Sequence, residues 1–135
     1  MKVKKGIALV MANAEYVQQN KLLACKKDGE DVKEALEYLN FDVIFGMDLN
    51  RADMYDIISR FIDEAKSYST VLVYYSGHGV QIDGENYFVP IDCEVMRSSR
   101  VMGQLCCVAQ VLYCLIPSLR ALRFCLIVVI LLVVP

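Results

Sequence analysis

Apolar and polar positions alternate between two patterns along the first part of the chain. Short, continuous apolar runs cover residues 4–12, 41–45 and 71–75, and such runs are typical of strands buried in a parallel sheet. Between them, apolar residues recur every three or four positions, which predicts one helix from about Asp28 to Leu39 and another from Asn50, its predicted cap, to about Lys66. This order predicts a right-handed, parallel, doubly wound α/β sheet with residues 71–75 as its central and most buried strand.

The pattern changes after Glu94. Residues 101–116 are apolar, could be helical and stop before Pro117. Residues 124–134 form one aliphatic run, which as a strand would be the fourth parallel member of the sheet. A bilayer needs about 20 apolar residues, so we favour the strand over the alternative, a membrane segment within residues 101–134. We therefore predict a core in residues 1–94 and a divergent apolar segment in residues 95–135.

Charge divides the chain at the same place. All 16 acidic residues lie at or before Glu94, and only arginines carry charge after it, for a net charge of −2. This balance predicts no nucleic-acid partner. Six cysteines form no CxxC pair and the chain has one histidine, so no metal site and no cofactor are predicted. We interpret four of the cysteines as small apolar residues and expect a reduced, cytoplasmic chain; the four are Cys106, Cys107, Cys114 and Cys125.

That histidine, His78, lies in Ser-Gly-His-Gly directly after the third apolar run. Glycines at 77 and 79 predict a sharp turn there, which would place the imidazole at the carboxyl edge of the sheet, where open α/β sheets bind ligands. An Asp83-Gly84 turn predicts a hairpin of residues 80–82 with 87–89 over that edge. A purely structural histidine needs no flanking glycines, so we favour a functional role for His78.

Three segments carry a resemblance: GIALVMAN, LLACKKDGEDVKEALEYLNFDV and TVLVYYSGHGVQIDGENYFVPID. They resemble the large-subunit (p20) half of the caspase-like cysteine peptidases (peptidase C14), the superfamily of caspases, metacaspases and paracaspases, and are most similar to paracaspases. The resemblance implies a mainly parallel sheet with helices on both faces and a polypeptide substrate. It implies that His78 is the catalytic histidine of a Cys–His pair and that Gly77 and Gly79 support the turn or the oxyanion. It also implies that Asp28 lines a pocket for a basic residue before the cleaved bond; from the sequence pattern alone, Asp28 could equally be a helix cap or first-turn acid.

The chain departs from this family pattern at the nucleophile. Members place a cysteine in an Asp-x-Cys context just after the fourth strand, about 50 residues beyond the histidine. That count falls on Val128, the nearest cysteine is Cys125 at the start of the run, and no acidic residue follows Glu94. We therefore expect a caspase-like fold truncated at the fourth strand, without the nucleophile and without activity in this chain alone. The alternative function is a non-catalytic fragment that binds a full-length relative as a homo- or heterodimer, including a membrane-attached form.

Overall fold

The computed structural model of the protein describes residues 3–94, 105–107 and 124–133. Their elements follow the chain in this order: β1 (Gly6–Ala12), α1 (Ala24–Tyr38), β2 (Phe41–Met47), α2 (Arg51–Ala65), β3 (Thr70–Ile82), β4 (Glu85–Phe88), β5 (Cys106–Cys107) and β6 (Phe124–Val133).

The strands form one mainly parallel sheet around β3. Strand β1 lies between β2 and β3 and runs parallel to both, while β6 pairs with β3 in parallel over its full length. Strand β4 returns antiparallel to the end of β3, and β5 pairs with β4. Val71 and Tyr75 are completely buried in the middle strand. The predicted central strand and the predicted fourth parallel strand are therefore both confirmed.

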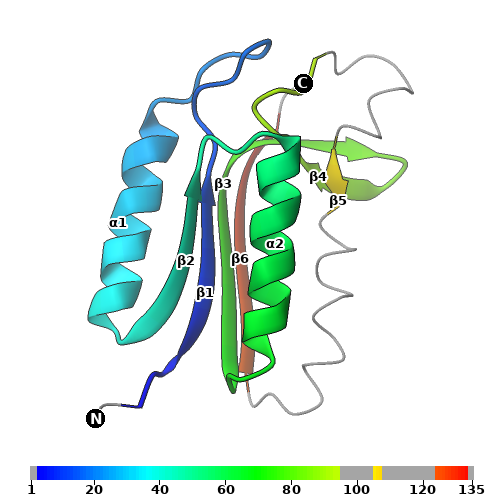
Figure 1. Cartoon of the computed structure of the whole chain (residues 1–135). Coiled ribbons are helices and arrows are strands. Elements are labelled where there is room, and N and C mark those ends of the chain that lie inside the picture. The colour runs from blue at the N-terminus through cyan, green and yellow to red at the C-terminus, as the bar shows by residue number, and fades with distance from the viewer. Residues whose placement is uncertain (1–2, 95–104, 108–123, 134–135) are drawn as a thin grey trace.

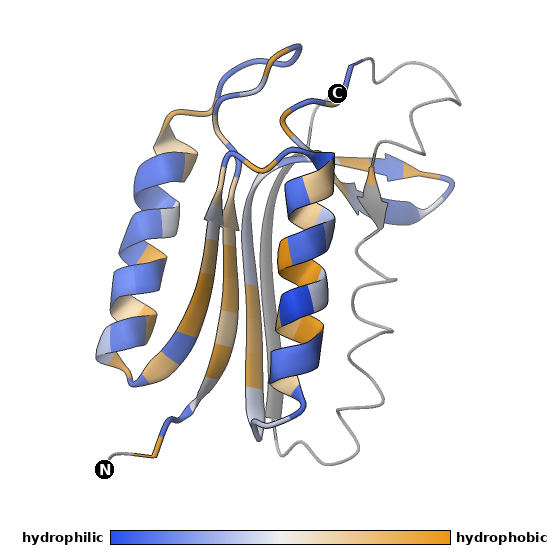
Figure 2. Ribbon diagram, viewed as in Figure 1, coloured by the Kyte–Doolittle hydropathy of each residue, from blue (hydrophilic) through white to orange (hydrophobic). Residues whose placement is uncertain are grey.

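One helix covers each face of this sheet (Figure 1). Alternate residues of a strand point to opposite faces. Leu9 of β1 therefore packs in the core under α2, with Phe61, while Val10 packs in the core under α1, with Leu36. Both helices mix hydrophilic and hydrophobic residues, whereas β1 between them is largely hydrophobic (Figure 2). The continuous apolar run of β1 is thus explained by burial on both faces.

The start of α1 differs from the prediction. The helix begins at Ala24, after Leu23, whose side chain makes no capping hydrogen bond. Cys25 is 2% exposed, and its N–H donates to the carbonyl of Leu22, so tertiary packing and the incoming loop set this start. Asp28 consequently lies in the second turn of α1, and its interpretation as a cap or first-turn acid is wrong.

Strand β3 also differs from the prediction, because it does not turn at Gly77 and Gly79. It continues through His78 to Ile82, and neither glycine has a positive φ. The turn comes at Asp83 (φ 51°) and Gly84 (φ 82°), the left-handed pair that a two-residue type I′ hairpin requires. The predicted hairpin is therefore confirmed, and the predicted turn beside His78 is wrong.

Little of the predicted helix at residues 101–116 can be compared with the structure. Cys106–Cys107 is the short strand β5, which pairs with Tyr87 and Phe88, so the helical prediction is wrong at these two positions. The other residues of that stretch, apart from Leu105, lie outside the described ranges. In the part of the chain that the structure describes, no helix is long and apolar enough to cross a membrane.

The predicted cap of α2 supplies a test of how local sequence supports the fold. The side-chain oxygen of Asn50 accepts the N–H of Asp53 at 2.8 Å. We expect Asn50→Ala to lower the free energy of unfolding by about 1 kcal/mol, measured by urea denaturation, because an N–H loses its partner. Asp56→Ala, at an exposed position in the middle of α2, should change it by less than about 0.5 kcal/mol. Equal losses in the two variants would contradict the capping role.

Candidate active site

At the carboxyl edge of the sheet, β3 extends beyond the end of β1. The last residue of β1, Ala12, pairs with Ser76, so Gly77 and His78 extend beyond the end of β1. Three chain segments close around this extension: residues 13–23, residues 48–50 and residues 89–93.

Asn13 joins these three segments. Its side chain is completely buried, accepts the N–H of Leu49 at 2.8 Å and donates to the carbonyl of Val89 at 3.2 Å. A buried amide with satisfied donors and acceptors holds its neighbours in one arrangement. The edge around His78 is therefore a fixed structure made from distant parts of the sequence.

Within the described residues, the imidazole of His78 has one hydrogen-bonded nitrogen and one buried nitrogen without a partner. Its Nε2 lies 2.8 Å from the carbonyl oxygen of Asn20, and because a carbonyl only accepts, Nε2 carries the proton and donates. In the neutral ring Nδ1 then holds a lone pair. Nδ1 is buried and has no hydrogen-bond partner within the described residues, and the whole side chain is only 6% exposed. The arrangement suits a general base whose second nitrogen is oriented by a fixed acceptor.

Two tyrosines contact the backbone of His78, and the sequence analysis missed both. The His78 N–H donates to the Tyr16 hydroxyl at 2.8 Å, and the Tyr75 hydroxyl donates to the His78 carbonyl at 2.7 Å. The Tyr16 ring also meets the imidazole edge-on, with centroids 4.5 Å apart. Burial raises the pKa of Tyr16 to about 12 and that of Tyr75 well above its ordinary value, so both hydroxyls stay protonated at neutral pH.

Gly77 makes room for this tyrosine pair. A β-carbon at Gly77 would lie 2.5 Å from the Tyr75 hydroxyl and 2.8 Å from that of Tyr16, closer than real contacts allow. The glycine is therefore required for its small size and not for a turn. A tyrosine in a polar loop gave the sequence analysis no signal of this contact, because it joins residues 59 positions apart.

The thiols that the structure describes are not bonded to His78. Cys25 and Cys93 are free and buried, and burial raises the pKa of Cys93. Cys25 lies in the first turn of α1. The backbone of Cys125 pairs with Val71, seven residues before His78, which corresponds to about 23 Å along a strand. The register confirms that Cys125 lies at the opposite end of the sheet from His78.

Asp28 lies at the same edge as His78 but makes no hydrogen bond or ion pair with it. The neighbouring Gly29 packs closely on Ala12: a β-carbon at Gly29 would lie 2.6 Å from the β-carbon of Ala12. Because Ala12 is the last residue of β1, this turn of α1 lies level with the end of β1. Asp28 is exposed, and within the described residues its carboxylate has no hydrogen bond or salt bridge, although its charge acts on neighbouring Lys27. Burial, helped by the charge of Asp28, raises the pKa of Tyr74.

Ion pairs anchor the loop that carries Asn20. The Glu15 carboxylate accepts Lys21 at 2.7 Å and Lys26 at 3.2 Å, and the Lys21 contact is the main cause of its lowered pKa. Asp48 accepts the backbone N–H groups of Ala14 and Glu15, each at 2.9 Å. These contacts connect residues 14–26 to the end of β2.

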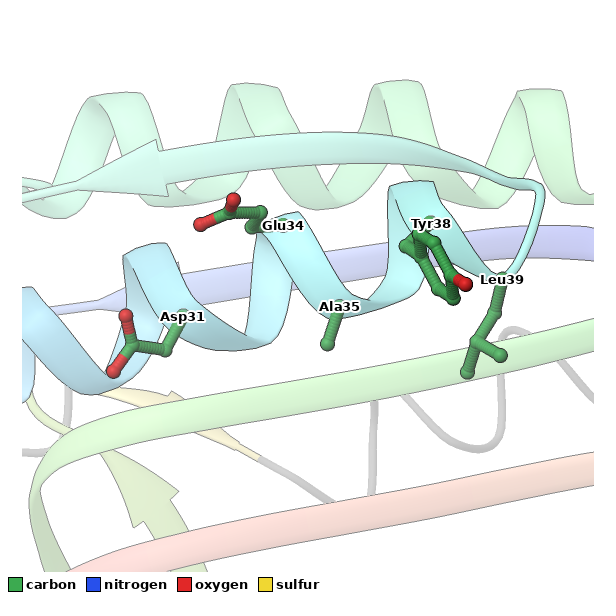
Figure 3. Close-up of a pocket in the computed structure, with 5 residues that line it drawn as sticks. All are labelled: Asp31, Glu34, Ala35, Tyr38 and Leu39. Atoms are coloured by element: carbon green, nitrogen blue, oxygen red, sulfur yellow. The ribbon is translucent and has the colours of Figure 1, made fainter.

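A separate hollow lies on α1, and it is not part of this edge. The residues that line it run from the middle of α1 to Leu39, which directly follows the helix (Figure 3). They are Asp31, Glu34, Ala35, Tyr38 and Leu39. No group of three His, Cys, Asp or Glu side chains that could hold a metal ion occurs among residues 3–94, 105–107 and 124–133.

Comparison with known proteins agrees with this architecture. The family model described as the caspase domain of peptidase C14 matches residues 5–113, and the chain belongs to this family. It is 30% identical over 89 residues to human mucosa-associated lymphoid tissue lymphoma translocation protein 1, and equally to the mouse homologue. That match covers 66% of this chain but only 11% of the relatives.

A solved structure shows the same fold. The Drosophila initiator caspase Dronc superposes with a TM-score of 0.71 at 14% identity, over 92% of this chain and 47% of that one. The predicted caspase-like α/β sheet, with helices on both faces, is thereby confirmed. The chain spans about half of the caspase and about a ninth of the curated relatives.

The raised pKa of Tyr16 predicts a loss of stability at high pH. Its folded pKa is about 12 against an ordinary 10, so the unfolded chain releases this proton first. The stabilising contribution is complete below pH 10 and falls as the pH rises towards 12. Between pH 9 and 11.5 we expect the unfolding free energy of the wild type to fall by about 2 kcal/mol more than that of Tyr16→Phe, in urea titrations followed by circular dichroism. Parallel losses in the two proteins would refute this.

Proposed function

We propose that this chain supplies the histidine half of a caspase-type cysteine endopeptidase site that cleaves polypeptides after a basic residue. The observation that carries the proposal is the state of the His78 ring: Nε2–H is held by the Asn20 carbonyl, and Nδ1 is buried without a partner in the described part of the chain. In the proposed reaction Nδ1 takes the proton of a thiol, and the thiolate attacks the scissile carbonyl carbon. His78 then gives the proton to the leaving amine as the peptide bond breaks.

The register of β6 supports a place for that thiol. Gly79 pairs with Val133, so a residue following β6 in the chain direction emerges at the edge where His78 lies. Within residues 1–135 no acidic residue follows Glu94 to form Asp-x-Cys, and neither Cys25 nor Cys93 is bonded to His78. We therefore propose that these residues alone form the base side of the site and lack a paired nucleophile.

Asp28 is the proposed contact for the basic side chain. Its carboxylate is exposed, has no ion-pair partner in the described residues and lies level with the end of β1. A carboxylate in this state pairs well with the guanidinium of arginine or the ammonium of lysine. Gly77 and Gly79 are retained in the proposal as supports for the oxyanion.

One observation favours a second candidate function. Strand β6 has ten residues, and in the described part of the sheet it pairs only with β3. An edge of this length can accept a strand from another chain. The second candidate is a non-catalytic fragment that binds a full-length relative as a homo- or heterodimer through β6. Free, buried Cys25 and Cys93 suit a reduced cytoplasmic compartment for either function.

The first test uses the chain as it is. Purified residues 1–135 are expected to show no turnover of fluorogenic peptides ending in arginine or lysine, because a histidine base without a thiol in reach opens no covalent pathway. His78→Ala provides the background rate. Turnover that is lost both in His78→Ala and in Cys125→Ala would overturn the assignment of a missing nucleophile.

The second test completes the site. Residues 1–133 are joined to a segment that carries an Asp-x-Cys motif, which the register of β6 would bring to the edge where His78 lies. We expect cleavage after arginine that requires His78, and we expect Asp28→Ala to lower kcat/KM for these peptides by about 10- to 100-fold through loss of a charge-assisted bond.

Glu30→Ala is the matched control for Asp28→Ala, because Glu30 is an exposed acid of the same helix. It should change kcat/KM by less than about twofold, and both variants should melt close to the parent. Equal cleavage by parent and Asp28→Ala, or a preference for acidic peptides, would rule out the proposed specificity.

A further inference from the structure

We propose that Tyr16 is a positioning residue for His78: its hydroxyl and its ring hold the backbone and the imidazole of the base, so that Nδ1 is presented in one orientation. This inference rests on the proposed function for its catalytic meaning. The contacts themselves lie within residues 13–89 and are independent of any nucleophile.

The need for Tyr16 begins with the ladder of β3. Ser76 still finds a partner at the end of β1, because its carbonyl accepts the N–H of Asn13 at 2.8 Å. In a strand, the residue two positions later directs its peptide groups to the same side. His78 is that residue, and β1 has already ended at Ala12. Its buried N–H must find another acceptor, and the Tyr16 hydroxyl takes that place at 2.8 Å.

Three hydrogen bonds around the two hydroxyls can be made at the same time. Each phenol has one proton. The Tyr75 proton goes to the His78 carbonyl at 2.7 Å, and the Tyr16 proton goes to the Val89 carbonyl at 3.0 Å. The Tyr16 oxygen is then available to accept the His78 N–H. Tyr16 thereby connects His78 to the segment that follows the hairpin.

The imidazole itself is held by the same loop. Tyr16 and Asn20 lie four residues apart, and one packs against the His78 ring while the other accepts its Nε2–H. Val17 adds a backbone bond to the carbonyl of Ile91 at 3.1 Å, which keeps this part of the loop against the segment after β4. Loss of the Tyr16 hydroxyl should therefore loosen both the backbone and the ring of His78.

Gly77 is an independent sign that the hydroxyl pair has a defined place. The 3.1 Å contact between the hydroxyls of Tyr16 and Tyr75 lies over this glycine, where a β-carbon would meet both oxygens at under 3.0 Å. Any other residue at position 77 would displace the pair from His78.

The experiment uses nuclear magnetic resonance, because His78 is the only histidine of the chain and selective ¹⁵N-histidine labelling gives a single set of signals. Tyr16→Phe keeps the ring and removes the hydroxyl. In uniformly ¹⁵N-labelled protein, we expect the His78 amide to exchange with solvent about tenfold faster relative to the Val71 amide. The ¹⁵N chemical shifts of the imidazole ring should also move from the values of a single Nε2–H tautomer towards the average of the two neutral tautomers.

Tyr68→Phe is the matched control. It removes another tyrosine hydroxyl, which donates a hydrogen bond to Asp42 of β2. Tyr68 lies just before the start of β3, away from His78. It should leave the His78 signals and the exchange ratio unchanged. If Tyr16→Phe speeds exchange at His78 and Val71 equally, or affects His78 no more than Tyr68→Phe does, the positioning role is overturned.

A kinetic measurement separates this inference from the proposed function. In the completed enzyme, Tyr16→Phe should lower kcat about tenfold and change KM by less than about twofold, because it disturbs the base and not the peptide contact. The completed enzyme with its natural Tyr16 could be inactive while Tyr16→Phe still changes the His78 signals as expected. In that case the peptidase proposal fails and the positioning role stands. If Tyr16→Phe does not fold, Tyr75→Phe replaces it, and an unchanged His78 carbonyl shift in that variant overturns the network.

Discussion

The structure around the candidate site depends on one constraint: β3 is longer than its neighbour β1, and its buried peptide groups beyond Ala12 must still be hydrogen-bonded. A buried N–H or carbonyl without a partner is costly, so loop residues have to replace the missing strand. Asn13, Tyr16 and Val89 meet this need with backbone and side-chain bonds. The loops at the carboxyl edge therefore follow the same hydrogen-bonding rule as the sheet, and the His78 N–H and carbonyl are bonded by residues of these segments and by Tyr75.

The elements that were predicted correctly are those whose signal is local. The charge-free run at 71–75, the helical spacing before Ala65 and the Asn50 cap each depend on neighbours within a few residues. The Asp83-Gly84 turn is equally local, since both residues must adopt positive φ. Such features can be read from one sequence because the interaction and the pattern have the same range.

The errors arose where distant residues decide the local structure. A glycine can serve for its backbone freedom or for its lack of a side chain, and the sequence does not distinguish the two. At Gly77 the second reason applies, because Tyr16 and Tyr75 occupy the space of a β-carbon. The start of α1 is a similar case: the burial of Cys25 and the backbone bond from Leu22 to Ala14 set it, although the first acidic residues come later. Tyr16 and Asn20 were missed for the same reason, as they meet His78 from 62 and 58 positions away.

The same geometry indicates how a site could work if its histidine and its thiol came from separate segments. Among the residues that the structure describes, the hydrogen bonds that orient His78 come from residues 16–89, so the histidine is held without any contribution from a thiol. Val133 of β6 pairs with Gly79, so a thiol that follows β6 in the chain would lie at the same edge as His78. Because Nδ1 is already oriented, only the thiol would still have to be positioned. Orientation achieved in advance lowers the entropic cost of bringing two reacting groups together. Under the proposed function, the fixed histidine would make the chain a competent partner for a nucleophile, and the hydroxyl of Tyr16 would be part of what that role requires.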